Sequence, residues 1–269
     1  MNDMRKVLKI VLAVVVSAVG LWSLHYGRRA LLCDSFVVRG CSMEPSLHDG
    51  EKIWVNKLRM GARIYTDFDF TKPSLSSVRL PGFSPVEAGD LVVANYPYAE
   101  TSDSINFRIN YVFLKRCYGA PGDTVLISDG FYRHPRTGGR IGDTTFQHIL
   151  HCRRDSLLVS DGVVLNALQH KRTGWTIRDF GPLYVPRKGD TVSLGRHNWR
   201  LHRKMIRYET GKEVRAKGDT VFVGGVPVRS YTFRSDWYFL GGDNVLDSRD
   251  SRYIGLFPEA YLVGAVWER

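Results

Sequence analysis

One long apolar run near the N-terminus restricts what this chain can become. Residues Ile10 to Tyr26 contain no Asp, Glu, Lys or Arg. At about 17 residues the run lies at the short end for a helix that crosses a bilayer. The remaining sequence contains no second run of this kind, which excludes a multi-span membrane protein. Basic residues flank the run on both sides, namely Arg5, Lys6 and Lys9 before it and Arg28 and Arg29 after it. The excess of positive charge before the run is small, so it favours a cytosolic N-terminus only weakly.

A cleaved signal peptide is the alternative interpretation of this run. A removable signal ends in small residues, whereas this run ends in Leu-Trp-Ser-Leu-His-Tyr at residues 21–26. Trp22 and Tyr26 are instead typical of the aromatic belt at a membrane interface. The sequence before Cys33 is a poor lipidation box, since Leu32 is too large for it. We therefore expect a retained anchor over residues 1–30.

The net charge of +11 is concentrated in two places. The N-terminal flanks hold part of it, and residues 196–217 hold eight basic and two acidic residues. Asn198 and Gly211 are suitable helix caps, and Leu201, Met205 and Tyr208 fall on one stripe, which predicts a basic helix over 198–211. Trp199, Tyr208 and the arginines around them also fit a nucleic-acid surface, which shows a basic face with interleaved aromatics. A solvated helix face near anionic headgroups is the commoner case and is favoured.

Beyond the anchor the pattern is rich in β-strands. Short apolar or alternating runs separated by Gly, Pro or Asp predict strands at 35–38, 52–56, 90–94, 111–116, 124–127 and 237–240. The phrase Gly-Asp-Thr-Val occurs three times, at residues 122, 189 and 218, and is typical of a turn that leads into a strand. Its irregular spacing excludes a solenoid. Residues 58–86 and 128–235 are predicted insertions, the second forming a smaller β domain.

Three segments carry residues suited to catalysis. In Gly40-Cys41-Ser42-Met43-Glu44-Pro45-Ser46-Leu47, a serine ends an apolar strand on a turn that Pro45 stiffens. Ser42 can therefore present its hydroxyl and backbone N–H to a carbonyl, although plain turn chemistry explains the same residues.

The second segment places Lys115 where an apolar strand should continue, directly after residues 111–114. Burial disfavours a charged amine and lowers its pKa, and a lysine with its pKa lowered by about two to three units is a usable general base. The alternative is an edge-strand lysine that extends to solvent.

The third segment, residues 241–255, is a polar loop close after a strand of aromatics. It is either a solvated loop or the scaffold of a site. In the second case Asp250 and Arg252 pair to hold it, and Ser248 offers its hydroxyl to an amine.

Together these segments resemble the conserved boxes of bacterial type I signal peptidases, the Ser–Lys proteases that remove signal peptides from exported proteins. The boxes Ser-Met-x-Pro-Ser-Leu, Gly-Asp-Leu-Val-Val, Lys-Arg-x-x-Gly-x-Pro-Gly-Asp and Gly-Asp-Asn…Asp-Ser-Arg occur in family order after an anchor. The match covers the anchor and roughly residues 34–57, 87–127 and 236–259. The insertions, with Val-Arg-Leu-Pro-Gly-Phe at 78–83, are most similar to the Bacteroidota branch.

The resemblance implies a role for each matching residue. Ser42 is the expected nucleophile, Lys115 the general base, and Ser248 the residue that orients the lysine amine. The Ser42 N–H is one expected oxyanion donor. The expected supporting residues are Gly40, Asp243, Asn244, Asp250, Arg252 and Arg116. The walls of small S1 and S3 pockets, which accept Ala at P1 and P3, are expected from Phe36, Val38, Met43, Leu47, Ile53, Val93 and Leu114. Substrate is expected to add as a strand along 36–40.

Two departures from the family pattern concern this site. Gly40 stands where the Gram-negative prototype has a serine that supplies a second oxyanion donor. Val245 and Leu246 replace the Arg-Asp that commonly follows Gly-Asp-Asn. Neither change touches the predicted dyad, so activity is expected with an altered rate.

The sequence leaves two further patterns open. His148, His151 and Cys152 have a spacing that suits one helix face, but no further cluster completes a metal site. Cys33, Cys41, Cys117 and Cys152 are able to pair in an oxidising compartment, and Cys41 and Cys117 each adjoin a catalytic box.

We therefore expect a mainly β, partly open, coiled, barrel-like catalytic domain at 31–127 and 236–269, with the inserted domain at 128–235. The expected activity is cleavage of signal peptides after Ala-X-Ala, without metal, cofactor or nucleic acid. The expected location is the cytoplasmic membrane, with one span and the catalytic domain on the periplasmic side. The alternatives are a self-cleaving Ser–Lys repressor, for which no helix-turn-helix is visible, and an inactive anchored binding protein, which should have lost Ser42 or Lys115.

Overall fold

The computed structural model describes residues 2–67, 69, 76–97 and 104–267. A curled seven-stranded antiparallel sheet forms its centre, in the order β1-β2-β17-β5-β6-β15-β16. Three separate stretches of chain build this sheet. The curled sheet confirms the predicted fold class, a mainly β, partly open barrel-like domain. Its strands are β1 (Cys33–Val37), β2 (Lys52–Asn56), β5 (Leu91–Asn95), β6 (Val112–Gly119), β15 (Trp237–Gly241), β16 (Phe257–Pro258) and β17 (Leu262–Val266).

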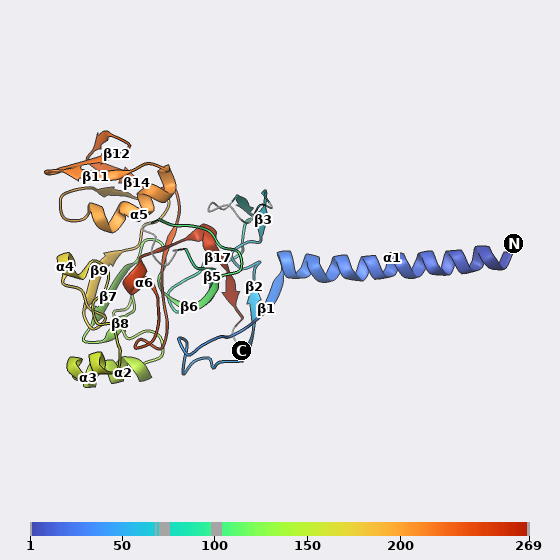
Figure 1. Cartoon of the computed structure of the whole chain (residues 1–269), viewed down its shortest axis with the longest axis horizontal. Helices are drawn as coiled ribbons and strands as arrows, with labels where there is room; N and C mark the ends of the chain where they lie inside the picture. The colour runs from blue at the N-terminus through green and yellow to red at the C-terminus, as the bar shows by residue number, and fades with distance from the viewer. Residues whose placement is uncertain (1, 68, 70–75, 98–103, 268–269) are drawn as a thin grey trace.

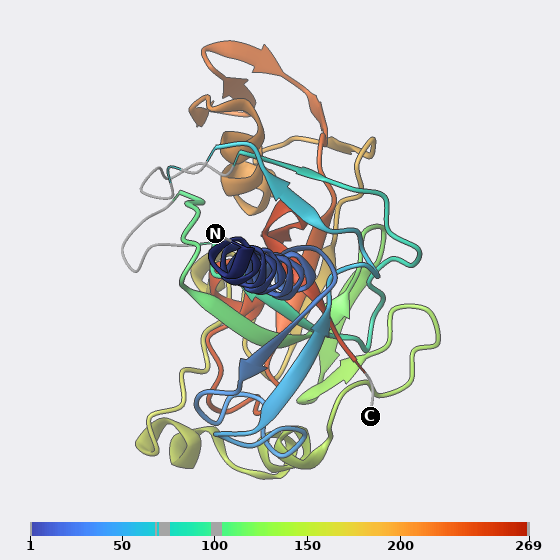
Figure 2. The same ribbon diagram turned by 90° about the vertical axis from the view of Figure 1, so that its right-hand side faces the viewer.

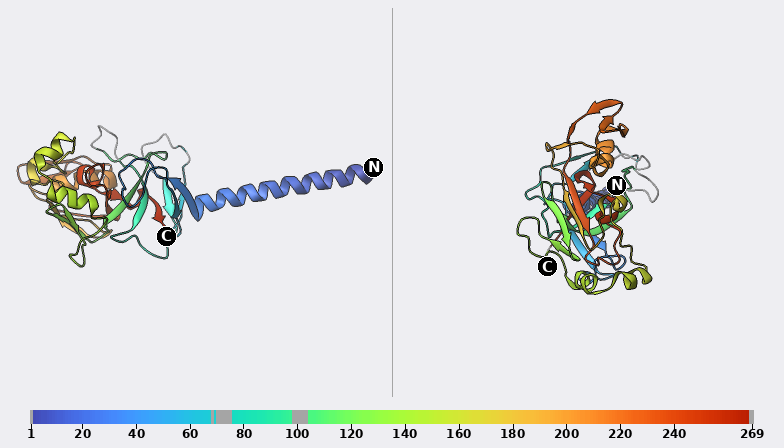
Figure 3. Two further views of the ribbon diagram at one scale, coloured as in Figure 1. Left: turned by 90° about the horizontal axis from the view of Figure 1, so that it is seen from below. Right: turned by 90° about the vertical axis from the view of Figure 1, so that its left-hand side faces the viewer.

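Helix α1 (Asn2–Leu31) projects from this body as a single rod (Figures 1 and 3). Its segment Lys9–Leu31 has a mean hydropathy of 1.8 and is not buried anywhere in the fold. Figure 2 views the molecule nearly along the axis of α1, which leaves the body beside β1 and β2. An apolar helix whose span is not buried by any other described residue fits a single-pass membrane anchor.

All six predicted strands are present; the strand predicted at 52–56 matches β2 at both ends, and the ends of the others differ by at most three residues. β2 alternates exposed and buried residues, as a strand with one covered face does. β15 is buried along its whole length, because further structure covers its second face. At three of the Gly-Asp turns, Asp90, Asp123 and Asp190 each accept a hydrogen bond from the backbone N–H three residues earlier. These carboxylates fix the turns that lead into the next strands.

The segment 58–86 contains the hairpin of β3 (Arg63–Tyr65) and β4 (Ser77–Arg79). Residue 68 and residues 70–75 of this predicted insertion lie outside the described residues, as do residues 1, 268 and 269 at the ends of the predicted anchor and catalytic regions. The hairpin lies beside the base of α1 (Figure 1).

Between β6 and β15 the chain is less purely β than expected. The sheet β8-β7-β9 is followed by short antiparallel pairings, β10 with β14 and β11-β12-β13. The strands are β7 (Thr124–Ser128), β8 (Phe131–Arg133), β9 (Phe180–Tyr184), β10 (Thr191–Ser193), β11 (Val214–Lys217), β12 (Thr220–Val223), β13 (Val226–Val228) and β14 (Ser230–Thr232). Three short helices that the sequence analysis missed also lie here, namely α2 (Thr145–Cys152), α3 (Asp155–Ser160) and α4 (His170–Thr173).

The β7 sheet and the central sheet share one hydrophobic core. The Phe180 ring meets Phe239 of β15 at a centroid distance of 5.5 Å, and Tyr132 meets the same ring at 6.3 Å. The domain boundaries at 128 and 235 remain a prediction.

The predicted basic helix is α5 (Trp199–Thr210), with Gly211 as its left-handed C-cap. Asn198 precedes the helix as expected, but its side chain closes the preceding turn through Gly195 N–H and Ser193 O. Met205 is buried, and Leu201 and Tyr208 pack partly buried against the core. α5 lies in the half of the body away from α1 (Figure 1). Its expected position near anionic headgroups stays a prediction.

Candidate active site

Ser42 lies in a tight turn that follows β1. The Gly40 N–H donates to Asp49 Oδ1 at 2.7 Å, with Gly40 at a positive φ of 77° that favours glycine. Asn244 holds the turn from the other side, because its N–H donates to Ser42 O at 3.2 Å and its side-chain amide donates to Cys41 O at 3.3 Å. Two chain segments about two hundred residues apart therefore fix the position of Ser42.

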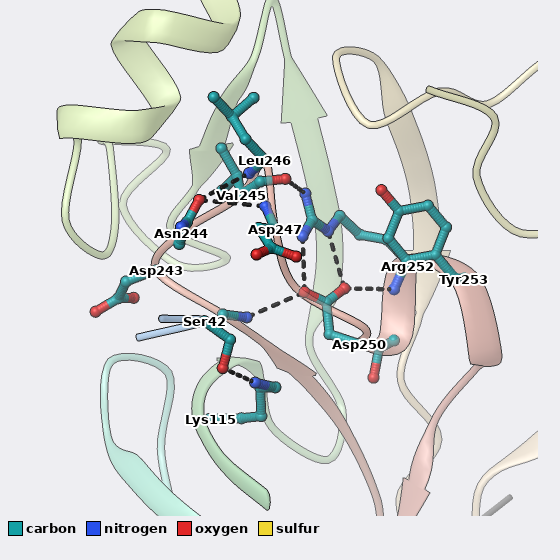
Figure 4. Close-up of polar contacts among 12 residues, drawn as sticks. Ser42, Lys115, Asp243, Asn244, Val245, Leu246, Asp247, Asp250, Arg252 and Tyr253 are labelled. Atoms are coloured by element: carbon teal, nitrogen blue, oxygen red, sulfur yellow. Dashed lines mark hydrogen bonds and ion pairs between the residues drawn. The ribbon is translucent and has the colours of Figure 1, made fainter. Parts of the chain in front are cut away.

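Lys115 of β6 points directly at this turn. Its Nζ donates to Ser42 Oγ at 2.6 Å (Figure 4), and the lysine is only 3% exposed. Burial lowers the pKa of Lys115 to about 8, against the opposing effect of Asp250 and with further lowering by Arg252. At pH 7 a lysine with this pKa is neutral about one tenth of the time, compared with less than one part in a thousand for a free lysine. The arrangement is a hydroxyl in contact with an amine that readily gives up its charge.

Asp243 lies under the turn and joins three elements. Its carboxylate accepts two hydrogen bonds from Arg116, at 2.8 and 2.6 Å, and one from Tyr118 OH at 2.9 Å. Ser46 Oγ donates to it at 2.5 Å. Asp243 is fully buried, so these donors compensate its charge. Arg116 follows Lys115 on β6, and the cluster therefore ties the strand of the lysine to the turn of the serine.

Asp250 and Arg252 form a second ion pair, and neither residue is exposed. Arg252 Nε and Nη2 donate to the two oxygens of Asp250 at 2.8 and 2.7 Å, and Nη1 donates to Val245 O at 2.7 Å (Figure 4). The Gly242 N–H donates to Asp250 Oδ2 at 3.0 Å. Burial raises the pKa of Asp250, but the charge and hydrogen bonds of Arg252 outweigh it, and the pKa lies below its usual value. The pair links the two ends of the loop, Gly242 and Arg252, to its middle at Val245.

Ser248 is 9% exposed and lies near Asp250, whose pKa it helps to lower. Its Oγ makes no hydrogen bond of standard geometry, so the expected bond to Lys115 Nζ is not formed in this structure. A Cβ on Gly242 would collide with both Ser248 Oγ and Ser42 O. Ser248 therefore lies against the backbone that supports the serine turn.

A cleft of about 530 Å³ opens beside the dyad. Six of the seven expected pocket residues line it, namely Phe36, Val38, Met43, Ile53, Val93 and Leu114. Leu47 does not; it is buried in the apolar cluster with Met43 and Ile53 and borders a different surface cavity. The backbone N–H of Leu47 donates to Met43 O at 3.0 Å and closes the turn there.

The sequence analysis also missed residues that the structure brings to the site. Ser46 and Tyr118 complete the shell around Asp243, and Asp247 and Arg249 line the cleft. Asp247 Oδ2 accepts a hydrogen bond from Cys41 Sγ at 3.1 Å. Ser46 and Tyr118 lie within the sequence boxes that contain Ser42 and Lys115. This position in the sequence was the one feature that could have marked them as site residues.

The suggested Cys41–Cys117 pair is not formed. All four cysteines are free, and Cys117 is buried in the main core while Cys41 borders the cleft. His151 pairs with Asp129, and Cys152 Sγ lies 3.6 Å from His148 Nε2. Within the described part of the chain, no three His, Cys, Asp or Glu side chains are grouped so that they could hold a metal ion.

Comparison with known proteins identifies the arrangement. The family model described as signal peptidase, peptidase S26, matches residues 4–132 and 226–268. The chain belongs to this family. The matched stretches contain the Ser42 turn, Lys115 and the loop of Asp243 to Arg252, and the unmatched residues 133–225 lie within the expected insertion.

Curated relatives carry the same family name. The chain is 27% identical to the signal peptidase I of Pseudomonas aeruginosa over 252 residues, which cover 89% of this chain and 66% of that protein. It is 24% identical to the Helicobacter pylori signal peptidase I over 251 residues, with 88% and 74% covered. The Bacillus amyloliquefaciens signal peptidase I is 31% identical over 168 residues, with 62% and 61% covered. The chain thus spans between about three fifths and three quarters of the length of these relatives. A Bacteroidota type remains a prediction.

Proposed function

We propose that this protein is a membrane-anchored serine endopeptidase that removes signal peptides from exported preproteins, with Ser42 as nucleophile and Lys115 as general base. The observation that carries the proposal is the 2.6 Å contact between Lys115 Nζ and Ser42 Oγ at the wall of the cleft. A neutral amine at this distance accepts the hydroxyl proton as the oxygen attacks the scissile carbonyl. The resulting ammonium returns the proton to the leaving amine, and the acyl-enzyme is then hydrolysed by water.

The negative charge of the tetrahedral intermediate needs hydrogen-bond donors. The Ser42 N–H is the proposed donor, since it makes no hydrogen bond to any described residue. The Gly40 N–H is engaged by Asp49 and supports the turn instead. Asn244, through Ser42 O and Cys41 O, is the proposed positioning residue for this donor.

The remaining supporting residues act through the backbone around the dyad. Asp243 and Arg116 connect the lysine strand to the serine turn, and Asp250 and Arg252 hold the loop beneath it. Ser248 fills the space beside Gly242, and we propose that its hydroxyl turns to the Lys115 amine when substrate covers the cleft.

The cleft suits an extended peptide. β1 is an edge strand of the central sheet, and β6 pairs with β15 only from Arg116 onward, so both walls present unpaired strand edges within the described sheet. A peptide that enters between them can pair with backbone on β1. Its alternate side chains then meet the apolar wall of Phe36, Ile53 and Val93. We propose that the pockets along this wall are shallow, so that they accept small side chains such as Ala at P1 and P3.

Helix α1 and the residues at its base support a membrane placement. Trp54 and Trp267 are 42% and 54% exposed and lie near the base of the helix, where Arg28 stacks over the Trp54 ring. Exposed tryptophans beside an anchor are typical of a membrane interface. We propose that α1 spans the cytoplasmic membrane once, with the catalytic body on the periplasmic side.

The test is cleavage of a preprotein bearing Ala-X-Ala by the full chain in neutral detergent. Ser42→Ala and Lys115→Met should each abolish cleavage, and Lys115→Arg should do the same because arginine keeps its proton. Ser160→Ala and Lys188→Met, at exposed positions far along the chain, are the matched controls and should cut like the unmodified protein. Retained cleavage in either dyad variant would refute the mechanism.

Specificity is tested on the same preprotein. Replacing Ala at P1 or P3 by Phe should abolish cleavage, whereas the same change at P2 should be tolerated. Because the proposed steps use only protein groups and water, a chelator should leave the rate unchanged. Equal cleavage of all three Phe substrates would contradict the proposed pockets.

A further inference from the structure

A second cavity of similar size lies away from the cleft. It encloses about 520 Å³ between α4, α5 and the end of α6 (Ser251–Ile254), within the range of small-ligand sites. In Figure 1 these helices lie on the side of the body opposite α1. The apolar side chains along its wall are Leu168, Leu201, Met205, Ile254 and Leu256.

The charge around this cavity has one sign. Lys171 and Arg172 come from α4, while Arg200, Arg203 and Lys204 come from α5. None of the described residues that line the cavity is an Asp or Glu. Cations from two separate elements thus border one hollow. Arg203 also lies 3.9 Å from Glu213, so the repulsion that an anion would relieve is that of Lys171, Arg172 and Arg200. Three of the five are arginines, whose planar fork matches the oxygens of phosphate.

The cavity is built into the fold. The Leu168 N–H donates to Arg252 O at 2.6 Å, so the wall is attached to the loop that supports the catalytic turn. His170 Nδ1 lies 2.7 Å from Trp175 O, which fixes the ring at the rim. A cavity with basic residues at its rim and apolar residues along its wall is complementary to a ligand that has an anionic group and an apolar group.

We propose that this cavity binds a phosphate ester, with the phosphate between the basic residues of α4 and α5 and the organic group against the apolar wall. The ester is a free molecule rather than a lipid of the bilayer, because the helices α4, α5 and α6 that border the cavity lie in the half of the body away from the anchor (Figure 1). The site is independent of the proposed peptidase activity.

The probe is phenyl phosphate, titrated calorimetrically into the full chain in neutral detergent, with inorganic phosphate and phenol as its two separate halves. Phenyl phosphate should bind more tightly than either. The Arg172→Ala/Arg200→Ala variant should weaken it by about tenfold or more, because each arginine supplies charge-assisted hydrogen bonds. Arg196→Ala is the matched control; this arginine belongs to the same basic segment, and its side chain is 72% exposed outside the cavity. It should bind as the unmodified chain does.

The titrations test whether the site exists and whether its ligand is a free ester or a lipid. No binding of phenyl phosphate, or equal weakening by Arg196→Ala, would overturn the site. Repeating the titration in phosphatidylcholine nanodiscs with and without phosphatidic acid tests the source of the ester. The same affinity in both discs supports a free ester, whereas competition by phosphatidic acid would overturn that part and assign the site to lipid. Cleavage by the double variant, measured in parallel, verifies that it is folded.

Discussion

The buried pair of Asp250 and Arg252 gives the sharpest prediction about stability. Asp250→Asn keeps the size of the side chain and removes its charge. Arg252 then stays fully buried beside a neutral amide that cannot accept both of its hydrogen bonds. Breaking a buried pair by removing one partner costs about 3–5 kcal/mol, since the remaining charge is uncompensated.

That cost is large enough to measure directly. For a domain of 150–250 residues, each kcal/mol lowers Tm by roughly 2–4 °C, so we expect a decrease of about 6–20 °C. Asp161→Asn is the matched control, because Asp161 also pairs with an arginine, Arg153, but the two side chains are 46% and 40% exposed. An exposed pair contributes about 0–1 kcal/mol, so the control should shift Tm by a few degrees at most.

The assay is thermal unfolding of the full chain in neutral detergent, followed by near-ultraviolet circular dichroism. The pH dependence supplies a second readout. The folded-state pKa of Asp250 is depressed, so its stabilisation is present above the unfolded pKa of about 3.9 and is lost as pH falls through the folded value. Asp250→Asn should lack this acid-dependent step. A Tm decrease no larger than that of Asp161→Asn would refute the reasoning.

Three further predictions concern the site and its surroundings. With the Lys115 pKa at about 8, the rate of peptide cleavage should rise with pH up to about 8 and level off above it, because the neutral amine is the reactive form. The range from about pH 6.5 to 9 spans this titration, so a rate that does not change across it would contradict the role of Lys115. Gly242→Ala should lower kcat with little change in KM, since its Cβ meets Ser248 Oγ and Ser42 O, whereas Gly195→Ala, where a Cβ meets nothing within 4 Å, should leave both unchanged. Thiol titration under denaturing, non-reducing conditions should count four reactive cysteines, and a count of two would restore the disulfide hypothesis.

The strands were predictable because their signal is local. Alternation of buried and exposed residues, as in β2, and Gly-Asp turns are properties of a few neighbouring residues. The short helices α2 to α4 gave no such signal. Helices of four to eight residues are stabilised by tertiary packing rather than by propensity, and the sequence analysis assigned their region to a β domain.

The site was partly predictable for a different reason. Ser42 and Lys115 stand in recognisable boxes, and the structure brings them together. The partners of Asp243 could not be found from spacing, because Ser46 and Tyr118 are separated from it by 197 and 125 residues. Which box residues face the cleft depends on the same long-range packing.

The electrostatics of the site explain how the pKa of Lys115 is lowered although acids lie nearby. Asp250 and Asp243 both raise the pKa of Lys115, and burial lowers it more. Each acid is held by an arginine, Asp250 by Arg252 and Asp243 by Arg116, so each unit presents little net charge to the amine. Arg252 itself lowers the lysine pKa. Removing Arg252 alone would therefore leave an uncompensated acid and raise that pKa, whereas removing Asp250 alone would lower it. Because the ion pairs cancel, burial decides the charge of Lys115.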